Sequence, residues 1–149
     1  MNYLLDTNVL VLLVVGLADP DLIGVHKNTQ AFNSAHFDVL FETLSPEMSI
    51  VSTPNVLTET SNMLAQIGEP KRSKIMNRFA LLIEDLEEIY LPRKAAAKSA
   101  HFVRLGLTDA VIANLKKDKC RVLSVDAKLC YACAESGIDA LNLTPMFYE

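Results

Sequence analysis

Hydrophobic residues occur along the chain in short runs that alternate with longer stretches of helical spacing. Residues 3–6 form one such run, residues 121–126 form another, and both runs finish in an aspartate. Short apolar runs bounded by polar residues are typical of buried strands. The same pattern predicts further strands at 48–52, 87–91 and 138–143.

Apolar residues at helical spacing predict the helices, and start and stop signals help to set their ends. Pro54 is placed in a first turn, where proline is favoured, and Gly137 follows the end of a later helix. Thr108 is placed to cap its own helix. The predicted helices cover residues 8–17, 36–44, 55–66, 70–85, 92–100, 108–117 and 127–135, and residues 18–34 are predicted to be a loop.

The order of these elements predicts the fold class. Strands that alternate with helices form α/β proteins, and their sheets are covered by helices on both faces. We therefore expect an α/β fold, a three-layer α/β/α sandwich with a mostly parallel central sheet. The helices at 55–66 and 70–85 follow each other closely and should form a helical hairpin.

Length and composition indicate a single domain spanning residues 1–149. The chain has 149 residues, half of them hydrophobic, which is enough to bury an independent core. Three cysteines are too few for a disulfide framework and favour a reducing compartment. The apolar run at 9–15 is far shorter than the ~18 residues that suggest a membrane span. We therefore expect a soluble, cytoplasmic protein with no membrane partner.

The net charge of −4 argues against a nucleic-acid partner, because phosphates are held by lysine and arginine. The basic residues are nevertheless clustered rather than evenly spread. The clusters are Lys71, Arg72, Lys74 and Arg78; Arg93, Lys94, Lys98 and Arg104; and Lys116, Lys117, Lys119 and Arg121. Solvated helix faces are the simpler explanation, but the clusters allow a nucleic-acid substrate.

Two acids are expected at the same edge of the sheet. Open parallel sheets bind their ligands beyond the carboxyl ends of the strands, and Asp6 and Asp126 both follow predicted strands. Either carboxylate alone is explained equally well as a cap of the following helix. Several acids that converge there would need a different explanation.

Four segments of the chain, taken in order, carry a family resemblance. They are LLDTN at 4–8, LTE at 57–59, GLTDAVIA at 106–113 and VLSVD at 122–126. This series resembles the signature segments of the PIN-domain nucleases over nearly the whole chain. The stretch at 16–48 is longer than in the compact toxin members of that family.

The resemblance implies a hydrolase that cleaves phosphodiester bonds, in most relatives those of RNA. It implies that Asp6, Glu59, Asp109 and Asp126 bind one or two divalent ions, Mg²⁺ or Mn²⁺. The chemistry agrees, because hard cations prefer oxygen ligands and can orient and activate water. We therefore expect an endoribonuclease that cleaves single-stranded RNA. The first, third and fourth segments also place polar side chains beside these acids.

Hydrogen bonds to the acids or to ordered water are expected from Asn8, Ser124 and Thr108, with local capping as the alternative. The thiols of Cys130 and Cys133, inside a predicted helix, are expected to be structural. His26 and Lys27 are expected to be a solvated pair outside the site.

Other functions compete with the endoribonuclease. A PIN fold retained as a binding or scaffold protein would usually have lost one of the acids, and all four are present. A phosphoacceptor signalling module normally has adjacent acids after its first strand, whereas Asp6 is followed by Thr7 and Asn8. The resemblance also suggests an antitoxin protein partner and a homodimer. The sequence does not distinguish RNA from structured DNA as the substrate.

Overall fold

The structure is a computed structural model, and it describes residues 2–44, 49–115 and 120–148. In chain order its elements are β1 (Asn2–Leu5), α1 (Thr7–Ala18), η1 (Pro20–Leu22), α2 (Ser34–Leu44), β2 (Ser49–Ser52), α3 (Pro54–Leu64), α4 (Lys71–Asp85), β3 (Glu87–Glu88), α5 (Arg93–Ala97), α6 (Phe102–Leu105), α7 (Leu107–Ala113), β4 (Arg121–Ser124), α8 (Ala127–Glu135), β5 (Ala140–Asn142) and α9 (Thr144–Phe147).

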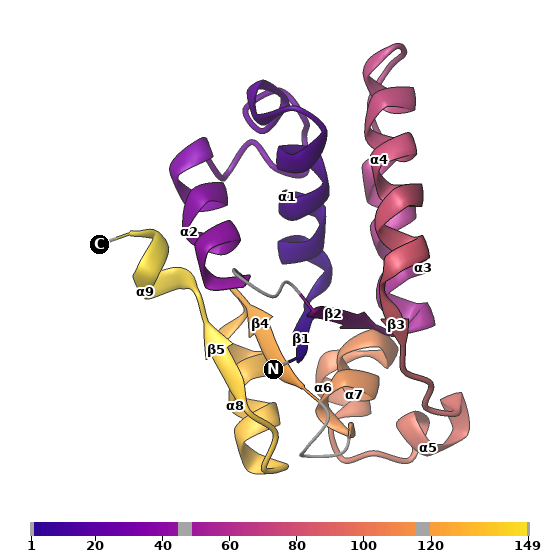
Figure 1. Ribbon diagram of the computed structural model, residues 1–149. Coiled ribbons are helices and arrows are strands. Elements are labelled where there is room, and N and C mark those ends of the chain that lie inside the picture. The colour runs from indigo at the N-terminus through magenta and orange to yellow at the C-terminus, as the bar shows by residue number, and fades with distance from the viewer. Residues whose placement is uncertain (1, 45–48, 116–119, 149) are drawn as a thin grey trace.

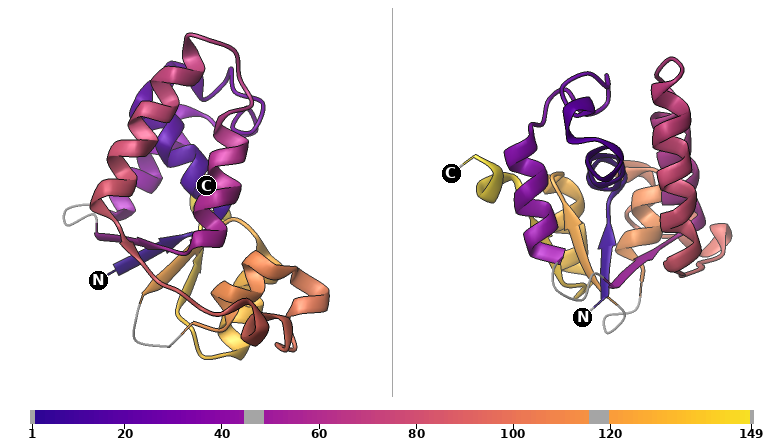
Figure 2. Two further views of the ribbon diagram at one scale, coloured as in Figure 1. Left: turned by 90° about the vertical axis from the view of Figure 1, so that its right-hand side faces the viewer. Right: turned by 45° about the horizontal axis from the view of Figure 1, so that its top comes forward.

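The described strands form one parallel sheet in the order β3-β2-β1-β4-β5. Helices lie on both faces of this sheet, so the predicted three-layer α/β/α architecture is confirmed. Figure 1 shows α1 and α2 on one side of the strands and α6, α7 and α8 on the other. The helical hairpin formed by α3 and α4 packs beside α1, as both views of Figure 2 also show.

Helix α1 is the centre of the core because it is apolar on every side. Its residues 9–15 are all valine or leucine, and each of them is completely buried. A helix that is hydrophobic all round needs neighbours all round. It has them in α2, α3, α4 and the sheet.

The close approach of α1 and α2 depends on one glycine. A Cβ atom built on Gly16 would overlap the ring of Phe37, which belongs to α2. The helix therefore accepts the lower helix propensity of glycine at this position. The predicted helix at 36–44 begins two residues earlier than expected, at Ser34.

The segment between α1 and α2 is a loop of turns around η1, as predicted, and it packs on the end of α3. His26 Nε2 lies 3.1 Å from the carbonyl oxygen of Leu64, and Asn28 Nδ2 donates to the carbonyl of Met63 at 3.0 Å. The last carbonyls of a helix lack partners within the helix, and here the loop supplies two donors. The prediction that His26 is solvated was wrong, because this loop buries the imidazole completely.

Several predicted boundaries differ from the structure between β3 and α7. The strand predicted at 87–91 is only β3, and the helix predicted at 92–100 ends at Ala97. A further short helix, α6, follows before Gly106, whose φ of 86° ends it. The predicted start of the strand at Met48 and the predicted end of the helix at Lys117 lie outside the described residues.

Candidate functional site

Asp6 joins the central strand to the buried helix. It directly follows β1, and its carboxylate accepts the Thr7 N–H at 2.7 Å as the N-cap of α1. The other carboxylate oxygen accepts the Ser124 hydroxyl at 2.8 Å. Burial raises the pKa of the Asp6 carboxyl, the charge of Asp126 raises it further, and the bonds from Ser124 and Thr7 oppose the rise.

Ser124 connects Asp6 to Asp126 across two neighbouring strands. The register pairs Leu5 with Leu123, so the ends of β1 and β4 lie side by side. The completely buried Ser124 hydroxyl donates to Asp6 and accepts the Asp126 N–H at 2.9 Å. The predicted hydrogen-bonding role of Ser124 beside the acids is therefore present in the structure.

Asp126 has a local structural role as well as a place at the site. Its Oδ1 accepts the Lys128 N–H at 2.9 Å, so it caps α8. Its Oδ2 has no hydrogen-bond partner within the described residues. The helix-cap reading is thus correct for one oxygen and leaves the other oxygen available to a ligand.

Asp109 lies within the electrostatic range of all three other acids. Burial raises the pKa of its carboxyl to about 7, and the charges of Asp6, Asp126 and Glu59 contribute further. Like charges disfavour ionisation of a neighbouring carboxyl, and this effect requires them to be close. Four acids from four separate segments of the chain therefore converge on one region.

Glu59 approaches the site from α3 and is the most exposed of the four acids. Burial of part of the side chain raises the pKa of its carboxyl, and the charge of Asp6 adds to this. The Thr108 hydroxyl donates a hydrogen bond to the Glu59 carboxylate. Thr108 makes no cap, because α7 begins at Leu107 with Gly106 as its N-cap, so that expectation was wrong.

The structure does not connect Asn8 to the acids. Its side chain is exposed in the first turn of α1 and makes no hydrogen bond with any of the described residues. The two positions that do contact the acids, Ser124 and Thr108, come from β4 and α7. Their contacts depend on tertiary packing rather than on sequence neighbours.

Cys130 lies beside the site, although its thiol was expected to have only a structural role. Burial raises the pKa of its thiol, and so do the charges of Asp6 and Asp126. Burial and the two charges therefore disfavour the thiolate form of Cys130 beside the acids. The sequence did contain a signal for this position: Cys130 follows Asp126 by four residues, and residues at that spacing share a face of a helix.

The donor chemistry of the four acids fits a hard divalent cation, which prefers oxygen ligands. Their arrangement is less complete. Within the described residues, no group of three or more His, Cys, Asp or Glu side chains is gathered closely enough to hold a metal ion. Mg²⁺ usually keeps several waters and binds through one or two carboxylates together with substrate phosphates. The acids therefore fit such an ion without forming a complete protein cage.

Two pockets flank the acids. One has a volume of about 320 Å³ and is lined by Pro54, Asn55, Thr58, Glu59 and Thr108. The other has a volume of about 310 Å³ and is lined by Arg104, Ala127, Lys128 and Tyr131. The acid region is thus bordered by concave surface on the side of α3 and on the side of α8.

The predicted basic clusters have different surroundings. Within the cluster on α4, Lys74 pairs with Asp19 at 3.0 Å and Arg72 lies 3.6 Å from Glu69. Lys116, Lys117 and Lys119 lie outside the described residues, and Arg121 pairs with Asp139 at 2.8 Å. The cluster on α5 and α6 is exposed and has no carboxylate partner in the described part of the chain.

Comparisons with protein-family models, with curated proteins and with solved structures found nothing that matches this chain. Among the helices that the structure describes, none is long and apolar enough to cross a membrane.

Proposed function

We propose that the protein is a Mg²⁺- or Mn²⁺-dependent endoribonuclease that hydrolyses single-stranded RNA. The observation that carries the proposal is the electrostatic convergence of Asp6, Glu59 and Asp126 on Asp109. Four acids gathered near the carboxyl ends of β1 and β4 repel one another, and this repulsion lowers the stability of the folded protein unless a ligand offsets it. A divalent cation is the ligand that removes this repulsion.

One or two of the four carboxylates would hold the cation together with water and the substrate phosphate, and the cation would supply an activated water and stabilise charge on the phosphate oxygens. Ser124 fixes one oxygen of Asp6, which leaves the carboxylate a single orientation. Thr108 orients Glu59 in the same way. These hydroxyls position the acids, so they act on the reaction through the carboxylates that they contact.

The competing functions make different demands on these residues. A binding or scaffold protein with this fold gains nothing from mutually repelling acids. A phosphoacceptor module normally has adjacent acids after its first strand, whereas Asp6 is followed by Thr7 and Asn8. Action with an antitoxin and pairing as a homodimer stay predictions from the sequence resemblance, and a cytoplasmic location stays a prediction from the cysteine content and the short apolar run.

The substitution Asp6→Asn tests the proposal. The amide retains an oxygen that can accept the Thr7 N–H, so we expect a folded protein that no longer cleaves RNA in Mg²⁺ or Mn²⁺. Asp38→Asn is the matched control, because Asp38 is an exposed residue of α2, a helix that carries none of the four acids. Cleavage at the wild-type rate by folded Asp6→Asn protein would refute the proposed function.

A further inference from the structure

The pocket on the α8 side of the acids combines two cations with an aromatic ring. We call it the Tyr131 pocket, and it is lined by Arg104, Ala127, Lys128 and Tyr131. Lys128 and Tyr131 lie three residues apart on α8 and so share a face of that helix. Arg104 reaches the same space from α6. The pocket volume of about 310 Å³ is in the range of small-ligand sites.

A hydrogen bond holds the two walls of the pocket together. His101, at the start of α6, lies with its Nε2 3.1 Å from the hydroxyl of Ser136 at the end of α8. The other ring nitrogen of His101 lies 3.3 Å from the guanidinium of Arg104. The His101 side chain therefore links the position of Arg104 to α8.

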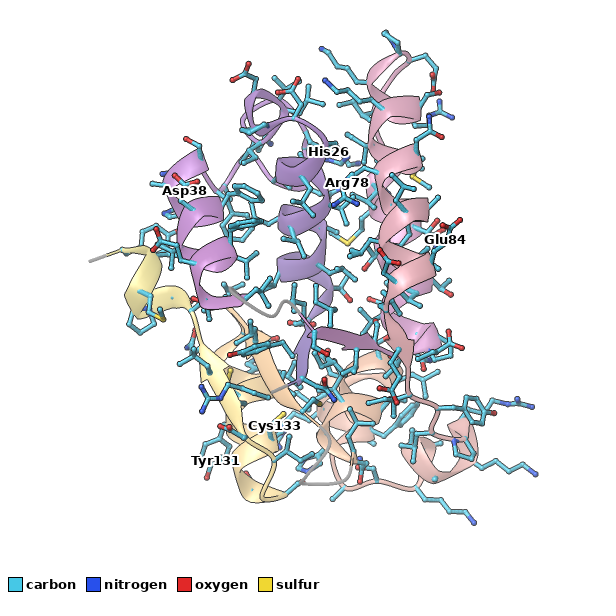
Figure 3. All side chains as sticks on the ribbon, viewed as in Figure 1. His26, Asp38, Arg78, Glu84, Tyr131 and Cys133 are labelled. Carbon is cyan, nitrogen blue, oxygen red and sulfur yellow. The ribbon has the colours of Figure 1, made fainter. Side chains whose placement is uncertain are left out.

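The charged and aromatic side chains of the pocket are available to a ligand. Arg104 and Lys128 are exposed, and neither forms an ion pair with a carboxylate of the described residues. Tyr131 is 65% exposed, and Figure 3 shows its ring directed away from the core while Cys133 of the same helix points inward. An exposed ring in one pocket with two cations that have no carboxylate partner among the described residues is a combination that binds a nucleobase and its phosphate.

We propose that the Tyr131 pocket binds one nucleotide of a single-stranded RNA next to the bond that is cleaved. The Tyr131 ring stacks on the base, and Arg104 and Lys128 contact the phosphate. This assignment rests on the proposed nuclease function. The pocket adjoins the acids because Asp126 caps α8, and the next two residues of that helix, Ala127 and Lys128, line the pocket.

The charge distribution explains why such a pocket is needed. The protein carries a net charge of −4, and its four converging acids repel phosphate. Arg104 and Lys128 provide two cations in the pocket that adjoins the residue after Asp126, and they offset this repulsion for one phosphate. Stacking adds affinity without choosing a base, because every base has an aromatic face. Ala127 contributes only a methyl group, so this wall of the pocket leaves room for a flat ring.

The absence of tryptophan from the chain allows a direct test. In the Tyr131→Trp variant the new indole is the only one, and a base that stacks on it quenches its fluorescence. Tyr148→Trp is the matched control, because Tyr148 is 63% exposed and directly follows α9, outside the Tyr131 pocket. The probe is a short, unstructured oligoribonucleotide of mixed sequence, added in Mg²⁺ to each variant in an Asp6→Asn background. We expect quenching at position 131 and none at position 148.

Binding of the same RNA, labelled with fluorescein, measures the contributions of the individual side chains. Tyr131→Ala should weaken binding about 5- to 160-fold, the range found for loss of base stacking. Lys128→Gln and Arg104→Gln should each lower the slope of log affinity against log salt by about 0.7, the value for one phosphate contact on a single strand. Lys71→Gln, at the start of α4, should leave the slope unchanged.

These outcomes separate the pocket from the nuclease function. Quenching at position 131 with no cleavage by the wild type would support the pocket and refute the nuclease. Cleavage by the wild type with no quenching at position 131, or with equal RNA affinity for wild type and Tyr131→Ala, would overturn the pocket and leave the nuclease standing. Equal quenching at positions 131 and 148 would show nonspecific contact and would also overturn it.

Discussion

The hydroxyl of Ser124 donates a 2.8 Å hydrogen bond to the carboxylate of Asp6, across the two neighbouring strands β4 and β1. Both residues are buried, so the bond is protected from competing water. It fixes the orientation of the most enclosed acid at the site.

Ser124→Ala should lower the rate of RNA cleavage by about 10- to 100-fold, the usual cost of losing a group that orients a metal ligand. The loss should be smaller than that of Asp6→Asn, because the carboxylate itself remains. Initial cleavage rates in Mg²⁺ measure the effect. Ser52→Ala is the control: Ser52 is a buried serine at the end of β2 whose hydroxyl has no partner in the described structure, so its rate should not change. Equal losses in both variants would show that the Asp6 contact is irrelevant.

The raised pKa of Asp109 predicts how stability depends on pH in the absence of metal. Its pKa is about 7 in the folded protein and 3.8 in the reference state, so the folded protein holds a proton that the unfolded chain releases. The resulting stabilisation is complete below about pH 4 and is lost as pH rises through about 7. In thermal melts in EDTA, the stabilisation from the Asp109 proton should therefore disappear as the pH rises from about 4 to about 7.

Asp109→Asn removes the titrating group, so the melting temperature of this variant should lack the pH dependence that Asp109 causes. Above pH 7 it should exceed the melting temperature of the wild type, because the variant has one repelling charge fewer. Asp38→Asn, on the surface of α2, should follow the wild type at each pH. A melting temperature of Asp109→Asn that stays below the wild type in EDTA at pH 8 would mean that the acids do not repel one another.

The strands and most helices were predictable because local signals determined them. The apolar runs that end at Asp6 and Asp126 became β1 and β4, and the proline at position 54 begins α3. The contact between Thr108 and Glu59 was not predictable, because it depends on the packing of α7 against α3. His26 is another such case, since its burial requires the carbonyl of Leu64 as a partner.

Gly16→Ala should destabilise the protein by about 1–3 kcal/mol, the usual cost of overpacking a core. Alanine favours a helix by about 1 kcal/mol over glycine, but its Cβ would overlap the Phe37 ring. Urea unfolding measures the difference. Gly24→Ala is the control, because a Cβ at Gly24 meets no atom within 4 Å. If the two variants were equally stable, the α1–α2 contact would be looser than described.

The central claim is that the converging acids share a divalent cation, and Mn²⁺ binding tests it most directly. Electron paramagnetic resonance measures free Mn²⁺ in titrations of the wild type, Asp109→Asn and the surface control Asp38→Asn. The account predicts equal affinity for the wild type and Asp38→Asn, and an affinity at least about 10-fold weaker for Asp109→Asn. Equal Mn²⁺ binding by all three proteins, or no binding by the wild type, would contradict it.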